Sequence, residues 1–395
     1  MEMTTKDRKA IENLVARVLP RVTDIRHRIH RNPEMGLKEY ETAALIRRVL
    51  KPTGIRLLPP FLGTDVVAML HGNGAGKNVT LRADIDALPL AEKTGAPYAS
   101  KHNGFMHACG HDGHTAMLIG AALVLSELRK TFSGSVRFVF QPAEEITAAG
   151  RDLVEKGALK NPEPDAVFAL HAWQGIPVGT LASKPGTFMA AADFFTITVR
   201  GKGAHGSMPH LSVDPILTAA RIVEALQSIA SRKVAPLDPV VVSVCRIAGG
   251  TNGNIIPDAV ELEGTVRHLT PSVGKHIRGW MEQIIKGVCD AAGATYEFDY
   301  TGNYIPTVNH AEAVEVGKRT ALALFGRKGW IDLTQPAMGG EDFAYYITEY
   351  AGAMFRLGMG EKSQNLHSPR FDFNDKALKN GIMFLAACAL DVLEP

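Results

Sequence analysis

Short apolar runs of strand length alternate with helical patterns along the first half of the chain. Apolar residues between positions 6 and 50 recur at helical spacing, with an interruption at Asn32-Pro33. Strand-like runs follow, and helical patterns separate the later ones; the runs are Asp65–Leu70, Val79–Ile85, Ser135–Phe140 and Ala166–Leu170. Continuous apolar runs are typical of strands that are covered on both faces. This order therefore predicts an α/β domain with a largely buried sheet.

A different order of elements begins near residue 191. The expected strands are Asp193–Val199, Val240–Arg246, Ala259–Leu269 and Thr295–Tyr300, and the expected helices are Val213–Lys233 and Val273–Ala292. Their order, β-α-β-β-α-β, is that of a ferredoxin-like domain. Beyond Pro306 the chain returns to mixed helix and strand, and it ends in an expected helix at Asp375–Leu393. We therefore predict a larger α/β domain with a mixed, mostly parallel sheet in two segments, 1–190 and 304–395, and an inserted ferredoxin-like domain at 191–303.

Charge and hydrophobicity exclude several classes of protein. The chain of 395 residues is 46% hydrophobic and 21% charged, and its formal net charge of +2 is too small to favour a nucleic acid or an acidic membrane as partner. Its apolar segments are too short to span a membrane, and the segment Met1–Asp7 lacks the apolar core of a secretory signal. We expect a globular protein of the reducing cytoplasm.

The four cysteines are spread along the chain and form no C-x-x-C pair. Cys245, Cys289 and Cys388 lie in apolar segments, so we interpret them as thiols of the core. Cys109 is different, because a glycine and several histidines surround it.

The run His107–His114, with the sequence HACGHDGH, gathers five potential metal ligands or supporting groups into eight residues. Thiolate, imidazole and carboxylate are the groups that transition metals prefer, and the two glycines allow neighbouring side chains to converge. A polar loop beside a buried free cysteine is the alternative interpretation. An apolar, helix-like segment, Thr115–Leu125, follows at once.

Further acidic and histidine residues follow the strand-like runs. Glu144 and Glu145 come directly after the third run, where adjacent carboxylates that point inward need a cation to relieve their repulsion. One of them can bind a metal while the other acts as a general base; the alternative is a solvated acidic turn. His171 directly follows the fourth run, and His367 lies in loop-like sequence. Taken alone, a histidine in the position of His171 is more often a core residue than a ligand, and His367 can be explained as an exposed loop residue.

Two aspartates at the end of the second run form a further candidate pair. Asp84 and Asp86 alternate with Ile85, so both carboxylates lie on one face of the expected strand. A carboxylate beside a metal-binding imidazole commonly orients the ring.

Together these motifs resemble the metal-dependent aminoacylase/carboxypeptidase superfamily, in its branch of hippurate hydrolases, indoleacetyl-amino-acid hydrolases and N-acyl-L-amino-acid amidohydrolases. The resemblance covers nearly the whole chain. It rests on Arg26–Glu34 (RHRIHRNPE), Leu81–Pro89 (LRADIDALP), His107–Ala116 (HACGHDGHTA), Phe140–Glu145 (FQPAEE) and Gly339–Ala344 (GGEDFA). Because separate motifs agree in their order, their joint specificity is high.

The resemblance implies a centre with two divalent metal ions. The positions that match the family's ligands are Cys109, His111, Glu145, His171 and His367. Glu144 matches the general base, which would take a proton from the attacking water and return it to the leaving amine. Asp86 matches the residue that orients a ligand.

One position departs from the wider superfamily. Asp84 stands where that superfamily has a histidine ligand, so we expect ligation to shift toward Cys109 and His111. A thiolate favours zinc, whereas carboxylates and water suit manganese, and cobalt or nickel are further candidates. The other three groups of the run, His107, Asp112 and His114, are interpreted either as supports of the ligands or as turn structure.

The resemblance also assigns roles to the inserted domain, as a lid and a dimerisation surface. In relatives the histidine that matches His205 reaches the active site of the partner subunit and polarises the substrate carbonyl; its alternative is a surface loop. Asn254 resembles a residue that holds the substrate. Arg267 is a candidate to pair with a substrate carboxylate, although an arginine on a strand is also a common surface charge.

The expected function is therefore hydrolysis of the amide bond of N-acyl amino acids by a homodimer or homotetramer. A dipeptidase or an N-acetyl-diamino-acid deacetylase is the alternative enzyme, because it shares the metal centre and the lid. A metal-binding module without catalysis, or a structural protein with buried histidines, is the alternative of another class.

Overall fold

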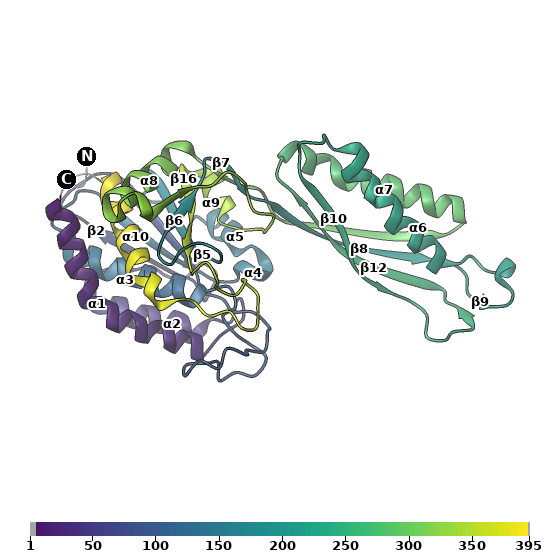
Figure 1. Cartoon of the computed structure of the whole chain (residues 1–395), viewed down its shortest axis with the longest axis horizontal. Helices are drawn as coiled ribbons and strands as arrows, with labels where there is room; N and C mark the ends of the chain where they lie inside the picture. The colour runs from purple at the N-terminus through teal and green to yellow at the C-terminus, as the bar shows by residue number, and fades with distance from the viewer. Residues whose placement is uncertain (1–4, 394–395) are drawn as a thin grey trace. The chain divides into compact units, whose positions relative to one another are not determined.

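The computed structural model describes residues 5–393, and the chain divides into two compact units. The first contains the chain up to Phe188, Val308–Gln335 and the chain from Asp342 onward; the second contains Met189–Thr307 and Pro336–Glu341. The segment Pro336–Glu341 groups with the second unit, although the predicted ranges, 1–190, 191–303 and 304–395, placed it in the larger domain. Figure 1 shows the elements of both units.

The first unit is built on a sheet of eight strands in the order β1-β2-β4-β3-β5-β16-β6-β15. The strands are β1 (Arg56–Leu57), β2 (Val66–His71), β3 (Asn78–Asp84), β4 (Ser135–Gln141), β5 (Ala166–Trp173), β6 (Leu181–Ser183), β15 (Trp330–Asp332) and β16 (Gly352–Gly358). The central strands β4, β3, β5 and β16 are parallel, and antiparallel pairs lie toward both edges. Most residues of the central strands are buried, as the apolar runs predict.

The helices of the first unit are α1 (Thr5–Arg31), α2 (Tyr40–Leu50), α3 (His111–Leu128), α4 (Glu144–Thr147), α5 (Ala149–Glu155), α8 (Ala311–Phe325), α9 (Ala344–Glu349) and α10 (Leu378–Leu393). Helix α3 is buried from His111 to Ser126, because it lies against α1, α10 and the central strands. A helix that is apolar on all sides needs such a position. Its buried first turn carries part of the HACGHDGH run.

The order of the strands locates a crevice at the carboxyl ends of β3 and β5. The chain passes from β3 through α3 to β4 on one side of β3, and then to β5 on its other side. In open α/β sheets, ligands bind where the strand order reverses in this way. Asp84 is the last residue of β3, and His171 lies near the end of β5. The fold therefore brings two candidate site residues to this crevice.

The second unit confirms the predicted ferredoxin-like order. Its elements are β8 (Ala191–Arg200), α6 (Pro215–Ser228), β10 (Val240–Ala248), β12 (Ala259–His268), α7 (Pro271–Ala292) and β13 (Thr295–Tyr304). The four strands form an antiparallel sheet in the order β10-β12-β8-β13, and α6 and α7 cover one face of it (Figure 1). A short ribbon of β9 (Ala204–His205) and β11 (Ile255–Ile256) completes the unit.

Three expectations need correction. Helix α3 begins at His111, so this ligand candidate lies on the first turn of a helix and not in a preceding loop. Helix α6 ends at Ser228, and a π-helical turn, Ile229–Lys233, replaces its expected last residues. Cys245 is exposed on the edge strand β10, so it is not a core thiol, whereas Cys289 and Cys388 are buried as predicted.

Among residues 5–393, no helix is both long and apolar enough to cross a membrane. Met1–Thr4, the start of the segment inspected for a secretory signal, lies outside that range.

Candidate metal centre

The turn that carries Cys109 is shaped by two glycines. Gly110 has a left-handed φ of 86°, and a Cβ atom there would approach the Cβ atom of Ala172 to 3.1 Å. A Cβ atom on Gly113 would lie 2.2 Å from the ring of Phe373, a distance that no side chain tolerates. Glycine at these positions therefore allows the start of α3 to pack closely against its neighbours.

Asp86 orients His111 and also fixes the backbone of Glu145. His111 Nδ1 lies 3.0 Å from the carbonyl oxygen and 3.1 Å from the carboxylate Oδ1 of Asp86, so Nδ1 carries the proton that it donates. The other carboxylate oxygen of Asp86 accepts the backbone N–H of Glu145 at 3.0 Å. His111 Nε2 is buried, and it has no hydrogen-bond partner among the described residues.

Cys109 and His171 face each other across the centre. The Cys109 Sγ atom lies 3.5 Å from His171 Nε2, while His171 Nδ1 donates to the carbonyl of Ala172 at 2.7 Å. Burial and the nearby carboxylates of Glu145 and Glu144 raise the pKa of the Cys109 thiol well above its ordinary value. A divalent cation would reverse this effect, because a positive charge stabilises a coordinated thiolate.

Glu145 connects the turn with the loop that carries His367. Its Oε1 atom lies 3.1 Å from His367 Nε2 and 3.9 Å from His111 Nε2, but no described residue meets this buried oxygen with hydrogen-bond geometry. His367 has a left-handed φ of 61°, and its backbone N–H donates to the carbonyl of Ala108 at 2.8 Å. A non-glycine residue in this conformation is uncommon and often marks a functional site.

The structure thus brings the five predicted ligands together in the first unit. The ligand atoms of Cys109, His111 and Glu145 lie within 4.8 Å of one another. Orphaned buried atoms on His111 and Glu145 are what a missing cation would leave behind, so the residues fit a metal. Their mixture of thiolate, imidazole and carboxylate suits zinc and does not exclude manganese.

Glu144 stands at the first position of α4, behind a strained residue. Ala143 has a φ of 51°, and its backbone N–H donates to Glu39 Oε1 at 2.9 Å. Burial raises the pKa of Glu39 to about 7, and Glu39 also accepts the hydroxyl of Thr64 at 2.7 Å. Glu144 itself is 6% exposed. The buried Glu144 therefore directly precedes Glu145 on the same short helix.

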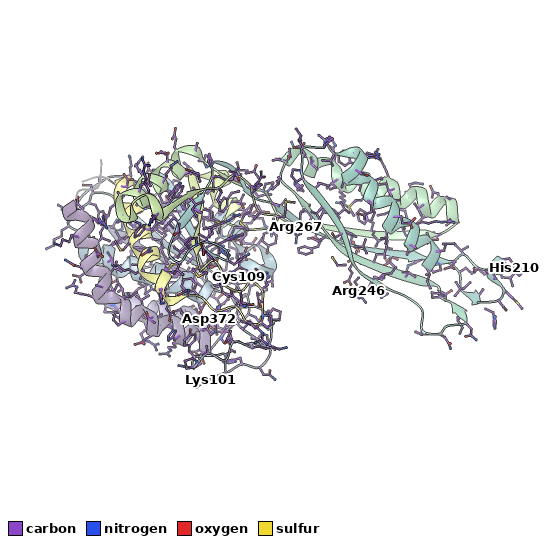
Figure 2. All side chains as sticks on the ribbon, in the orientation of Figure 1. Lys101, Cys109, His210, Arg246, Arg267 and Asp372 are labelled. Carbon is purple, nitrogen blue, oxygen red and sulfur yellow. The ribbon has the colours of Figure 1, made fainter. Side chains whose placement is uncertain are left out.

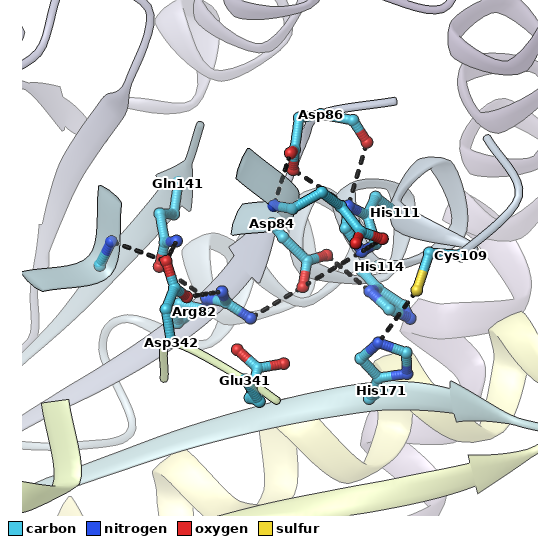
Figure 3. A network of polar contacts seen from close by, with 12 residues as sticks. Arg82, Asp84, Asp86, Cys109, His111, His114, Gln141, His171, Glu341 and Asp342 are labelled. Atoms are coloured by element: carbon cyan, nitrogen blue, oxygen red, sulfur yellow. Dashed lines mark hydrogen bonds and ion pairs between the residues drawn. The ribbon is translucent and has the colours of Figure 1, made fainter. Parts of the chain in front are cut away.

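Asp84 is held by neighbours on two sides. Its Oδ2 atom accepts from Arg82 at 2.8 Å and its Oδ1 atom lies 2.6 Å from His114 Nδ1. Burial alone would raise the pKa of Asp84, but its neighbours His111, His114 and Arg82 hold it well below its usual range. Figure 3 shows this network between β3 and the ligands.

Two residues in this network were missed by the sequence analysis. Arg82 is fully buried, and it donates to Gln141 at 2.9 Å and to Asp342 at 2.7 Å as well as to Asp84. Asp342 also accepts from Gln141 and from the backbone of Gly150. An arginine in the middle of an apolar strand-like run was the available signal, because a buried arginine needs an anionic partner.

A second buried network joins α1 to the same turn. Arg26 is completely buried and pairs with Asp112 at 2.8 Å, with Asp375 at 3.0 Å and with Asp372. His30 lies 2.8 Å from Asp112. Asp112 follows His111 directly, so this cluster fastens the first turn of α3 to α1. Of the two interpretations left open for Asp112, the structure favours support of the ligand turn.

We expect His30 to make the free energy of unfolding depend on pH. Burial opposes protonation of His30, but Asp112 outweighs it and raises the pKa from 6.5 to about 9. The folded chain therefore keeps a proton that the unfolded chain loses near pH 6.5. The contribution, on the order of 3 kcal/mol, is complete below about pH 6.5 and disappears as the pH rises through 9. Denaturant unfolding at pH 6 and at pH 9 measures it.

The variant His30→Gln is the control for this expectation. It removes the titrating group, so the difference in the free energy of unfolding between wild type and variant should shrink as the pH rises. A difference that stays constant between pH 6 and pH 9 would assign the stabilisation to packing alone.

The other three predicted site residues belong to the second unit. His205 Nδ1 accepts the backbone N–H of Ser207 at 3.1 Å, so a neutral ring carries its proton on Nε2 and can donate it. Asn254 is a neighbour, because its carbonyl accepts the N–H of Gly206 at 2.7 Å. Arg267, labelled in Figure 2, is half-buried. Its guanidinium carbon lies 5.4 Å from the centre of the Phe194 ring. Their contacts with substrate stay predictions.

Comparisons with known proteins agree with one another. A family model described as Peptidase family M20/M25/M40 matches residues 80–391. The N-acetylcysteine deacetylase of Bacillus subtilis (strain 168) is 39% identical over 375 residues, which cover 95% of this chain and 97% of that protein. The IAA-amino acid hydrolase ILR1-like 2 of Arabidopsis thaliana is 37% identical over 381 residues, 94% of this chain and 84% of its own. A crystal structure from Bacillus subtilis, described as a dinuclear metal binding peptidase from M20 family, is 35% identical with a TM-score of 0.81 and covers 96% of this chain and 99% of its own.

Proposed function

We propose, from the premise that the chain belongs to peptidase family M20/M25/M40 and is a metal-dependent amide-bond hydrolase, that its substrates are N-acyl amino acids. Two relatives carry names of enzymes that act on such compounds, a deacetylase of N-acetylcysteine and a hydrolase of IAA-amino acids. Membership in this family of hydrolases counts against the alternatives without catalysis. Another relative, named thermostable carboxypeptidase 2, keeps peptides as the rival substrate class.

The observation that carries the proposal is the convergence of the five ligand candidates, together with a second acidic residue, Glu144, next to Glu145. Cys109, His111, Glu145, His171 and His367 would hold two divalent ions, with zinc or manganese as first candidates and cobalt or nickel as others. Bound metal ions lower the pKa of a coordinated water and polarise the amide carbonyl. Glu144 has no ligand role in this set, so it is available for proton transfer.

The chain's own residues then supply the proton transfers. Glu144 accepts a proton from the attacking water and returns it to the nitrogen of the leaving amino acid. Asp86 keeps the Nδ1–H of His111 engaged, so the ring is held with Nε2 turned to the centre, where a bound metal ion would take its lone pair. His205 offers its Nε2–H to the negative charge that develops on the carbonyl oxygen. Asn254 and Arg267 are proposed to hold the substrate, with Arg267 opposite its carboxylate.

A substrate series tests this assignment directly. We expect hippurate and N-acetyl amino acids to be hydrolysed with higher kcat/KM than dipeptides of the same amino acids, in protein loaded with zinc or manganese. Liberated amino acid is the measured product. Turnover of dipeptides alone would show that the enzyme is a dipeptidase, and turnover of N-acetyl-diamino acids alone would show the corresponding deacetylase.

We further propose a homodimer or homotetramer whose active site uses His205 of the partner subunit. Subunits that carry His205→Ala or Glu144→Gln should be nearly inactive as homodimers. Random mixing gives heterodimers with one complete site, so activity should return to about a quarter of wild type. Mixing after verified subunit exchange measures this recovery. No recovery would mean that His205 acts within its own subunit, and full activity of His205→Ala alone would mean that it does not act at all.

The reducing cytoplasm is the proposed location. All four cysteines are free, and Cys109 can bind a metal only as a reduced thiolate. Small N-acyl amino acids are the proposed partners, and no nucleic acid or membrane is needed for the proposed chemistry.

A further inference from the structure

The parallel sheet opens between the carboxyl ends of β3 and β5. These two strands pair only over Val79–Arg82 and Ala166–Ala169. Past that region β3 turns toward β4, since the N–H of Ile85 donates to the carbonyl of Gln141 at 2.9 Å, while β5 continues to its end. The part of β5 that carries His171 therefore lacks β3 as a ladder partner on this edge.

The side chain of His114 fills this opening. It is 1% exposed and comes from the first turn of α3. The backbone N–H of Ala172 donates to His114 Nε2 at 2.7 Å, and His114 Nδ1 lies 2.6 Å from Asp84 Oδ1. A backbone N–H can only donate, so Nε2 holds the lone pair and Nδ1 carries the proton given to Asp84. Both ring nitrogens are thereby used.

The backbone of Ala172 passes this restraint on to His171 through the two peptide groups that flank its Cα atom. Its N–H is bound by His114, and the carbonyl of the same residue accepts from His171 Nδ1 at 2.7 Å. The second bond fixes the tautomer of His171 and turns Nε2 toward Cys109. The ring of His114 also packs edge-on against that of His171, with 4.7 Å between centroids.

The other end of the bridge is equally fixed. Asp84 is held by Arg82, and Arg82 is held in turn by Gln141 and Asp342 (Figure 3). Each of these contacts is buried. His114 therefore spans from a rigid anchor on β3 to the unpaired edge of β5.

We propose that His114 is a positioning residue, which joins the separated ends of β3 and β5 and so holds His171 in the geometry that metal binding requires. The inference rests on the proposed function in one respect, that His171 is a metal ligand. The inference also gives Asp84 a role, as the residue of β3 to which His114 is anchored. The wider superfamily has a ligand histidine at this position.

The rival interpretation is that His114 binds metal itself. Ligand atoms of Asp84, His111, His114 and His171 lie within 4.8 Å of one another, as a metal site would require. An imidazole whose two nitrogens are both engaged has no lone pair for a metal, which favours the bridge. The two interpretations differ in what can replace the histidine.

Two amide variants separate them. In His114→Gln the side chain can still accept from Ala172 and donate to Asp84, whereas in His114→Asn it is one carbon shorter and reaches Asp84 alone. We expect zinc affinity, measured by chelator competition, to stay near wild type in the Gln variant and to fall about 10–100-fold in the Asn variant. The absorption of bound cobalt(II) should show the same order, since it reports the thiolate and the number of ligands.

Thr115→Val is the matched control. The hydroxyl of Thr115 donates to the backbone carbonyl of Asp84 at 3.1 Å, from the same helix to the same strand, but does not touch β5. This variant should lower the stability of the fold and leave zinc affinity unchanged. Equal losses in the Gln and Asn variants would make His114 a ligand and overturn the proposal, as would wild-type affinity in the Asn variant.

These measurements need no substrate. A chain that shows the expected metal affinities but hydrolyses no N-acyl amino acid would refute the proposed function and leave the role of His114 standing. A chain that hydrolyses such substrates but loses zinc affinity equally in the two amide variants would support the proposed function and refute the role of His114.

Discussion

Replacing Glu144 with glutamine should lower kcat by roughly 10²–10⁴-fold while the bound metal stays in place. Glutamine has nearly the same shape, but it cannot take a proton from water and return it to the leaving amine. Glu144 is buried behind Ala143, whose N–H is held by Glu39, so the amide should occupy the same position. Steady-state kinetics on an N-acyl amino acid, with metal analysis of the same sample, measures both quantities.

Glu155→Gln is a suitable control, because Glu155 is an exposed carboxylate at the end of α5 and should be replaceable without effect. Loss of metal in Glu144→Gln would indicate that Glu144 is a ligand, and the paired role of Glu145 would need revision. Unchanged turnover with full metal content would show that another group is the general base.

The fold was predictable because its information is local. Apolar runs of strand length and helical periodicity depend on neighbours in the chain, and they were sufficient for the buried sheet and for the β-α-β-β-α-β order of the second unit. Short edge strands such as β1, β6 and β15 were not predicted, because two or three residues are too few to show a periodicity. The start of α3 at His111 was not predicted either, because a glycine-rich motif resembles a loop.

The candidate site was predictable only as a set of residues. Motifs named Cys109, His111 and Glu145, and the structure places their ligand atoms together. The supports of the site could not be named, because they join residues far apart in the chain: Arg82 with Asp342, and Arg26 with Asp372 and Asp375. No local pattern encodes such pairs. They follow from the way the sheet and α1 are packed around the crevice.

Removing the thiol of Cys109 should weaken metal binding and activity together. Cys109→Ser leaves a neutral hydroxyl where the centre has a thiolate, next to Glu145 and His171, and a neutral hydroxyl is a poor ligand. The expected loss of zinc affinity exceeds the roughly 10–100-fold that is typical of substitutions around a ligand. Chelator competition with zinc and with manganese, together with kcat/KM at saturating metal, measures it.

Cys109→Asp distinguishes the need for an anionic ligand from the need for a soft one. The carboxylate restores the charge but prefers harder ions, so affinity for manganese should recover more than affinity for zinc. The buried neighbours of Cys109, Glu145 and Glu144 among them, already crowd negative charge around this position, and in the absence of metal they raise the pKa of the thiol. A bound cation is therefore needed to stabilise an anionic side chain at position 109. Wild-type zinc affinity in Cys109→Ser would show that Cys109 is not a ligand, and equal recovery of both metals in Cys109→Asp would show that charge alone matters.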